Sequence, residues 1–164
     1  MNELWIPNAS PIIVLAKIER LDLLSGQGMS LSVPEAVVDE ILGAPAQDPA
    51  RRAVESGWEG PAVQVFPDPH IIEWGLGTGE TAILSLARQK RATAVVDDRA
   101  ARTACKALGI RFIGTLGVVL RVKMRGQIHS AVEVLKALQE AGLFLDRDLI
   151  QTALRKATGE NWPE

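Results

Sequence analysis

The stretch WIPNASPIIVLAKIERLDLL, residues 5–24, contains a strand and a helix separated by a short polar break. The apolar residues 4–6 predict a buried strand, which ends at Pro7 because proline cannot donate a hydrogen bond to a neighbouring strand. Ser10, followed by a proline, predicts a capped helix start. We therefore expect a strand that leads directly into a helix, with Asn8 in the turn between them.

Short apolar segments and amphipathic segments alternate along the rest of the chain, as in a parallel sheet whose strands are joined by helices. This pattern predicts an α/β fold, a three-layer α/β/α sandwich around a parallel sheet of about five strands. Further strands are expected at residues 29–33, 63–66, 93–96 and 111–113. Helices are expected at residues 10–24 (ended by Gly26), 34–42, from Asp48 onward, 78–90 (capped by Thr78), 99–108, 115–126 (capped by Thr115), 130–141 and 146–158.

The composition is that of an ordinary globular protein: 164 residues, 47% hydrophobic and 23% charged. We expect a single domain over residues 1–164, with a core over about 4–128 and C-terminal helices over about 130–158. Cys105 is the only cysteine, so neither an intrachain disulfide nor a cysteine zinc site is expected.

No apolar run reaches the ~18 residues of a membrane span, and Glu3 and Pro7 interrupt any signal-peptide pattern. A cytoplasmic location is therefore expected. The net charge of −2 provides no general attraction to nucleic acids, so such a partner requires a local basic patch.

Oxygen-bearing side chains are expected to gather at one edge of the sheet. Asn8 follows the first strand, and Asp97 and Asp98 follow the strand at residues 93–96. Glu80 lies in the first turn of one helix and Glu40 in the last turn of another. Ligands of doubly wound sheets bind where the carboxyl ends of the strands meet, and carboxylates are the ligands that Mg²⁺ and Mn²⁺ prefer. The placement predicts a divalent metal site.

Each of these acids also has an ordinary structural explanation. Glu80 can complement the helix dipole, and either Asp97 or Asp98 can cap the next helix. Glu40 can be a solvated helix residue, as can the neighbouring Asp39.

Several segments together resemble the PIN-domain superfamily, and within it the uncharacterised prokaryotic branch related to VapC-type toxin nucleases. The similarity covers about residues 6–128, and LIQTALRKATGE (149–160) resembles the closing helix of that branch. The segments are NASPIIVLAKIERLDLL (8–24), VPEAVVDEIL (33–42), GTGETAILSLA (77–87), VVDDRAAR (95–102) and IGTLGVVLRVKMRGQI (113–128).

The resemblance implies a parallel sheet between helices and a metal-dependent endoribonuclease with three or four acids around one or two Mg²⁺ or Mn²⁺ ions. It also implies RNA as substrate, a homodimer and, for a toxin, a small antitoxin partner. Ser10 matches a polar residue beside the first acid. The acid positions of the family fall on Asn8, Glu40, Glu80 and Asp98, with Asp97 as a neighbour.

The chain departs from the family pattern at its first acid, where Asn8 replaces an aspartate and Ala9 follows. Asparagine offers a carbonyl oxygen without the charge on which Mg²⁺ affinity depends. The activity is therefore expected to be weakened or lost. The alternative is a catalytically inactive PIN-like module that binds RNA or a protein.

Seven lysines and arginines and no acid occur in residues 99–125, and we expect Arg99 and Arg102, with Ser10, to contact the substrate. The same residues could be ordinary outer faces of helices. Aromatic residues make up only 4% of the chain, which argues against a stacking platform for bases. A third hypothesis, a nucleotide-binding loop at GLGTGE (75–80), lacks both the G-x-G-x-x-G spacing and a P-loop lysine.

Overall fold

In the computed structural model, which describes residues 3–25, 29–58 and 60–163, four parallel strands form one sheet in the order β2-β1-β3-β4. The two central strands are β1 and β3, in which Trp5 pairs with Thr93 and Pro7 with Val95. The strands are β1 (Leu4–Pro7), β2 (Ser30–Leu31), β3 (Thr93–Val95) and β4 (Phe112–Ile113).

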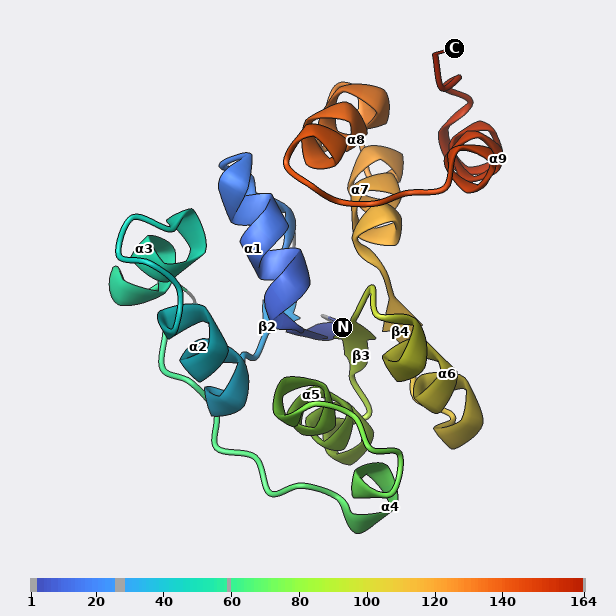
Figure 1. Ribbon diagram of the computed structural model, residues 1–164. Helices are drawn as coiled ribbons and strands as arrows, with labels where there is room; N and C mark the ends of the chain where they lie inside the picture. The colour runs from blue at the N-terminus through green and yellow to red at the C-terminus, as the bar shows by residue number, and fades with distance from the viewer. Residues whose placement is uncertain (1–2, 26–28, 59, 164) are drawn as a thin grey trace.

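Helices cover both faces of the sheet, so the expected three-layer α/β/α sandwich is confirmed. Figure 1 shows α1 and α7 on one side of the strands and α5 and α6 on the other. Every helix in the described ranges is too short or too polar to cross a lipid bilayer. The helices are α1 (Ala9–Lys17), α2 (Glu35–Leu42), α3 (Pro49–Glu55), α4 (Pro69–Ile72), α5 (Thr78–Lys90), α6 (Arg99–Leu108), α7 (Thr115–Met124), α8 (Ala131–Glu140) and α9 (Arg147–Thr158).

The first helix is shorter than expected. It ends at Lys17, because Glu19 adopts a left-handed backbone conformation (φ 58°) that an α-helix does not allow. The chain then forms the 3₁₀ turn η1 (Leu21–Leu23), which buries Leu23 in the core. Gly26, the expected end of the helix, lies outside the described residues.

The prediction of a strand at residues 63–66 is wrong. Only Val63 pairs, through an isolated bridge to Pro34, and the sheet therefore has four strands rather than about five. Pro61 and Pro67 flank this segment and cannot donate to a ladder. The short helix α4 that follows was not expected, although Asp68 caps it just as Asp48 caps α3.

Three helices are capped differently from the expectation. The N-caps of α1, α5 and α7 are Asn8, Gly77 and Gly114 rather than Ser10, Thr78 and Thr115. The cap expected at Asp48, where α3 begins, is confirmed, and so is the capping of α6 by one of the paired aspartates, which is Asp98. The structure also shows that Ser130 caps α8 and Asp146 caps α9.

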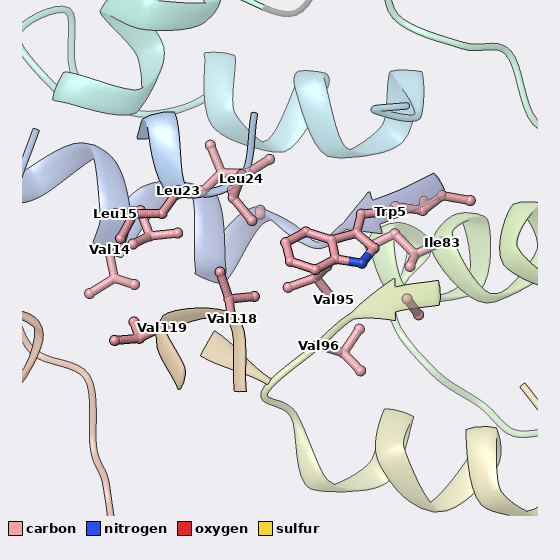
Figure 2. Packing of buried hydrophobic residues seen from close by; sticks show 14 of the residues in the cluster. Trp5, Val14, Leu15, Leu23, Leu24, Ile83, Val95, Val96, Val118 and Val119 are labelled. Atoms are coloured by element: carbon pink, nitrogen blue, oxygen red, sulfur yellow. The ribbon is translucent and has the colours of Figure 1, made fainter. Parts of the chain in front are cut away.

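One cluster of buried apolar side chains joins the sheet to the helices on both of its faces. Trp5 is fully buried, and Figure 2 shows its indole close to Val95 of β3 and Val118 of α7. Leu154 of α9 belongs to the same cluster, so the C-terminal helices share the core. Each fully buried Leu, Ile or Val side chain stabilises the fold by about 1.5–3 kcal/mol, and together they hold the strand ends in place.

Glu160 fastens the C-terminus to α8. Its carboxylate accepts hydrogen bonds from the Ser130 hydroxyl (2.9 Å) and the Ala131 N–H (3.0 Å). Burial raises the pKa of this carboxyl, but the hydrogen bonds, including one from the Val132 N–H, outweigh burial and hold the pKa below its ordinary value of 4.5. Because the pKa is lower in the folded state, the ionised carboxylate stabilises the fold above that ordinary value, and this contribution disappears as the pH falls through the lowered pKa.

We expect Glu160→Gln to lower the thermal midpoint at pH 7, because the neutral amide is a weaker acceptor at the N-terminus of α8. The difference from wild type should shrink as the pH falls below 4.5 and the carboxylate becomes protonated. Calorimetric scans of both proteins between pH 3 and 7 measure it. A difference that stays constant over this range would contradict the assignment.

Candidate functional site

A pocket of about 680 Å³ opens at the carboxyl ends of β1 and β3. It brings together six of the eight side chains that the sequence marked for a site, and leaves out Arg99 and Arg102. Its lining is Asn8, Ala9, Ser10, Ile13, Val14, Lys17, Glu40, Glu80, Asp97, Asp98, Ala141, Gly142, Leu143 and Phe144.

Asn8 lines this pocket and is only 5% exposed. Its backbone N–H donates to the Val95 carbonyl (3.0 Å), which ties the end of β1 to the end of β3. Its side-chain oxygen accepts from the Ala9 N–H (2.8 Å), and its amide nitrogen donates to Glu80 Oε1 (3.4 Å). The donation to Glu80 requires an amide, because an aspartate in this place would carry a second negative charge and no donor.

Glu80 lies in the first turn of α5 and folds back over the N-cap Gly77. A Cβ at position 77 would lie 2.5 Å from Glu80 Oε2, so the glycine leaves the room that the carboxylate occupies. The positive end of the helix dipole stabilises a negative charge here. The same carboxylate fills the place where a nucleotide phosphate would bind the GLGTGE loop, which argues against the nucleotide-binding hypothesis.

Glu40 reaches the site from α2, across the first turn of α5. A Cβ added to Gly79 would lie 3.7 Å from Glu40 Oε2 and 3.4 Å from Asn8 Oδ1. The small residue at 79 therefore lets these two oxygens approach the same point. Glu40 is otherwise exposed, so its carboxylate is free to turn toward the pocket or toward solvent.

Asp97 connects β3 to α7. Its carboxylate accepts from the Thr115 N–H (2.8 Å) and the Thr115 hydroxyl (2.5 Å), and a Cβ on Gly114 would lie 3.0 Å from its Oδ1. The side chain thus caps α7 from outside the helix, and both of its oxygens are engaged. Thr115 is fully buried, which explains why its hydroxyl serves Asp97 rather than its own helix.

Asp98 and Ser10 lie on the walls of the pocket and are exposed. Asp98 Oδ2 accepts from the Ala101 N–H (2.9 Å) as the N-cap of α6. Within the described part of the chain no other residue donates to its Oδ1, so this oxygen can face a ligand.

The two arginines expected to contact the substrate begin α6, outside the lining of the pocket. Arg99 is exposed and follows Asp98 directly. The Arg102 guanidinium lies over the Phe112 ring, 5.3 Å from its centroid. This stacking holds Arg102 against β4, where the guanidinium stands close to Gly114 and the Asp97 carboxylate.

The basic residues of the 99–125 segment are divided between the two ends of the sheet. Arg111 and Arg121 line a pocket with Glu3 and Thr93 at the amino ends of the strands, and Arg121 pairs with Glu3. The charge asymmetry of the sequence therefore does not translate into one basic surface around the carboxylates.

Buried Cys105 offers no nucleophile to this site. Burial raises the pKa of the thiol to about 11, although the nearby Arg102 partly opposes the shift. The thiol is therefore protonated at neutral pH, and it lies outside the pocket lining.

The donors that face the pocket suit Mg²⁺ or Mn²⁺ in type, because they are carboxylate and amide oxygens. Among the described residues, however, no three His, Cys, Asp or Glu side chains gather closely enough to hold a metal ion. Mg²⁺ characteristically uses one or two carboxylates together with water and substrate phosphates. The site fits such an open arrangement and does not fit a closed cage of protein ligands.

Sequence reasoning did not predict the other lining residues of the pocket, and two of them, Lys17 and Phe144, can contact a ligand. Lys17 ends α1, and Phe144 lies in the connection between α8 and α9. Lys17 lies in the segment 8–24 that resembles the family, but it was not expected to contact a ligand. Phe144 lies outside every such segment, and only the folding of the C-terminal segment back toward α1 brings it to the pocket.

A family model described as a PIN domain matches residues 4–159. No curated protein and no solved structure matches the chain significantly.

We expect Asp97→Ala to lower the free energy of unfolding by about 2–3 kcal/mol, because two charge-assisted hydrogen bonds are lost and the buried Thr115 hydroxyl loses its acceptor. Urea unfolding followed by circular dichroism measures the change. The control Asp39→Ala removes an exposed carboxylate from α2 and should shift the free energy by less than about 0.5 kcal/mol. Equal midpoints for the two variants would disprove the capping role of Asp97.

Proposed function

Because the chain belongs to the PIN-domain family, we propose that it is a metal-dependent endoribonuclease whose active site is the pocket at the carboxyl ends of β1 and β3. The observation that carries this proposal is the convergence of Asn8, Glu40, Glu80 and Asp98 on that single pocket. We further propose that it acts in the cytoplasm as a homodimeric toxin restrained by a small antitoxin protein, as the family resemblance implies.

The residues that would hold Mg²⁺ or Mn²⁺ are Asn8, Glu40, Glu80 and Asp98. Such an ion supplies neutralisation of the phosphate charge and activation of a bound water. Glu80 is held in place by its position over Gly77, whereas the exposed Glu40 and Asp98 can turn toward the pocket. Since no three acids are gathered beforehand, we propose that oxygens of the RNA complete the coordination.

Asp97 is a positioning residue in this scheme. Its bonds to Thr115 fix the end of β3 relative to α7, and they hold the neighbouring Asp98 at the rim of the pocket. Ser10, Arg99 and Arg102 are proposed to contact the RNA backbone on either side of the scissile phosphate. Hydroxyl and guanidinium groups are typical phosphate ligands.

Asn8 sets the charge of the site. It makes the pocket less negative by one unit than an aspartate would, and it donates to Glu80 where an aspartate would repel it. The site is therefore stable without a cation. The same loss of negative charge lowers its affinity for a metal ion. We propose that the nuclease is slow for this reason.

Incubation with structured RNAs and Mn²⁺ tests the activity. We expect slow cleavage that Glu80→Gln reduces at least about tenfold, because the amide replaces a charged ligand. The matched control Glu133→Gln makes the same change on the exposed surface of α8 and should cleave like wild type. If neither wild type nor Asn8→Asp cleaves any RNA, the nuclease proposal is wrong.

Asn8→Asp tests the charge argument without relying on activity. Without metal, this variant should melt at a lower temperature than wild type, because a buried carboxylate then faces Glu80. Added Mn²⁺ should raise its melting temperature more than that of wild type, and calorimetry should show tighter Mn²⁺ binding. If Mn²⁺ changes the melting temperature of the two proteins equally, residue 8 is not a metal ligand.

The second candidate function is a catalytically inactive PIN-like module that binds RNA or a protein. The neutral Asn8 and the engaged oxygens of Asp97 favour it. RNA binding without cleavage, together with an absence of Mn²⁺ binding in both wild type and Asn8→Asp, would support this function over the nuclease.

A further inference from the structure

The pocket has two walls of different chemistry. Carboxylate and amide oxygens occupy the wall beneath the strand ends. A second group of lining side chains, called the second wall below, comes from α1 and the α8–α9 connection and is apolar or cationic. This second wall contains Ile13, Val14, Lys17, Leu143 and Phe144. A metal ion and a phosphate would not contact apolar side chains favourably. The second wall therefore indicates a ligand that also has an apolar part.

Phe144 presents its ring to solvent at this wall. Its side chain is 88% exposed, although it lines the pocket. The neighbouring Leu143 and Leu145 pack against the core, and the alternation of an extended chain turns the residue between them outward. The connection itself is anchored where it leaves α8, because the Leu143 N–H donates to the Leu138 carbonyl (2.9 Å). Figure 1 shows this connection passing from the side of α1 across to α9.

Lys17 adds a positive charge to the same wall. It ends α1, and a rise of 1.5 Å per residue places it about 13 Å along the helix from Asn8. That distance is too long for Lys17 to share the phosphate at the carboxylates, but it suits a neighbouring phosphate of the same strand. Lys17 is exposed and forms no salt bridge with another described residue, so its charge is available to a ligand.

The low aromatic content argues against an extended stacking platform, but a single ring suffices for one base. We propose that Phe144 and Lys17 form a nucleotide subsite, in which Phe144 stacks one unpaired base and Lys17 contacts an adjacent phosphate. The proposal rests on the ribonuclease function and specifies its substrate as RNA with at least one unstacked nucleotide beside the scissile bond. A flat aromatic face accepts any base, so the subsite selects for single-strandedness rather than for sequence. A nucleotide matches both walls, because its phosphate meets the oxygen-lined wall through a metal and its base meets the apolar one.

Fluorescence anisotropy of a labelled ten-nucleotide single-stranded RNA tests the subsite, measured with Ca²⁺ in place of Mn²⁺ so that a cation is present while cleavage is suppressed. Phe144→Ala should weaken binding by about 5- to 100-fold, and Phe144→Trp should retain it. The control Phe66→Ala removes a ring that is 81% exposed and lies outside this pocket, and it should bind like wild type. The same RNA annealed to its complement should bind wild type more weakly, and Phe144→Ala should not affect that binding.

Lys17→Gln should weaken single-strand binding and reduce the slope of log K against log salt by about 0.7, the value of one phosphate contact. Its control is Lys136→Gln on the exposed face of α8. An unchanged slope would remove Lys17 from the subsite.

The outcomes separate this proposal from the nuclease function. If RNA is cleaved but Phe144→Ala binds and cleaves it as wild type does, the subsite is wrong and the nuclease stands. If Phe144→Ala loses binding while no protein cleaves RNA, the subsite stands and the nuclease falls. Failure of wild type to bind the single strand would overturn the subsite.

Discussion

The parallel pairing of β1 with β3 is the constraint on which the rest of the structure depends. Pro7 lies opposite Val95, and the next N–H along, that of Asn8, donates to the Val95 carbonyl. This register ends both strands at the same level, so that Asn8 and the Asp97–Asp98 pair emerge side by side. A shift of the register by one residue would turn buried Trp5 and Ile6 toward the wrong faces, which the core does not allow.

The polar side chains at this edge serve the fold and the site together. Asp97 and Asp98 hold the beginnings of α7 and α6, and Glu80 lies over the beginning of α5. Helix N-termini stabilise carboxylates that would otherwise repel each other in a partly buried pocket. The ordinary structural explanation of each acid and its proposed role in metal binding are therefore compatible. Asn8 lowers the remaining repulsion further, and in doing so it weakens the attraction for a cation.

The distribution of positive charge follows from the same architecture. Helix α7 carries its basic residues away from the carboxylates toward the amino ends of the strands, where Arg121 meets Glu3 and the Trp5 ring. Arg99 and Arg102 stay near the site because they begin α6 directly after β3. Contacts with a nucleic acid at the pocket must therefore come from a few residues at helix ends, together with the wall of Lys17 and Phe144.

The sequence by itself determined the order and type of most elements, because hydrophobic periodicity and Asp–Pro or Gly boundaries are local signals. It also determined which oxygens, from Asn8 to Asp98, reach one edge of the sheet, since the carboxyl ends of parallel strands share that edge.

The prediction of a strand at residues 63–66 was wrong because an apolar run does not reveal whether a neighbouring strand is available to pair with it. The cap expected at Thr115 failed because Asp97, 18 positions earlier in the chain, accepts the hydrogen bonds of that terminus. The cap expected at Thr78 failed because Glu80, in the same turn, folds back over the N-cap Gly77. Only the tertiary structure decided that Asp97 is engaged while Asp98 keeps an oxygen free, because Asp97 bonds to Thr115, 18 positions away. It also decided that Phe144 lines the same pocket as Asn8, because the packing of α8 and α9 onto the core brings together residues more than a hundred positions apart.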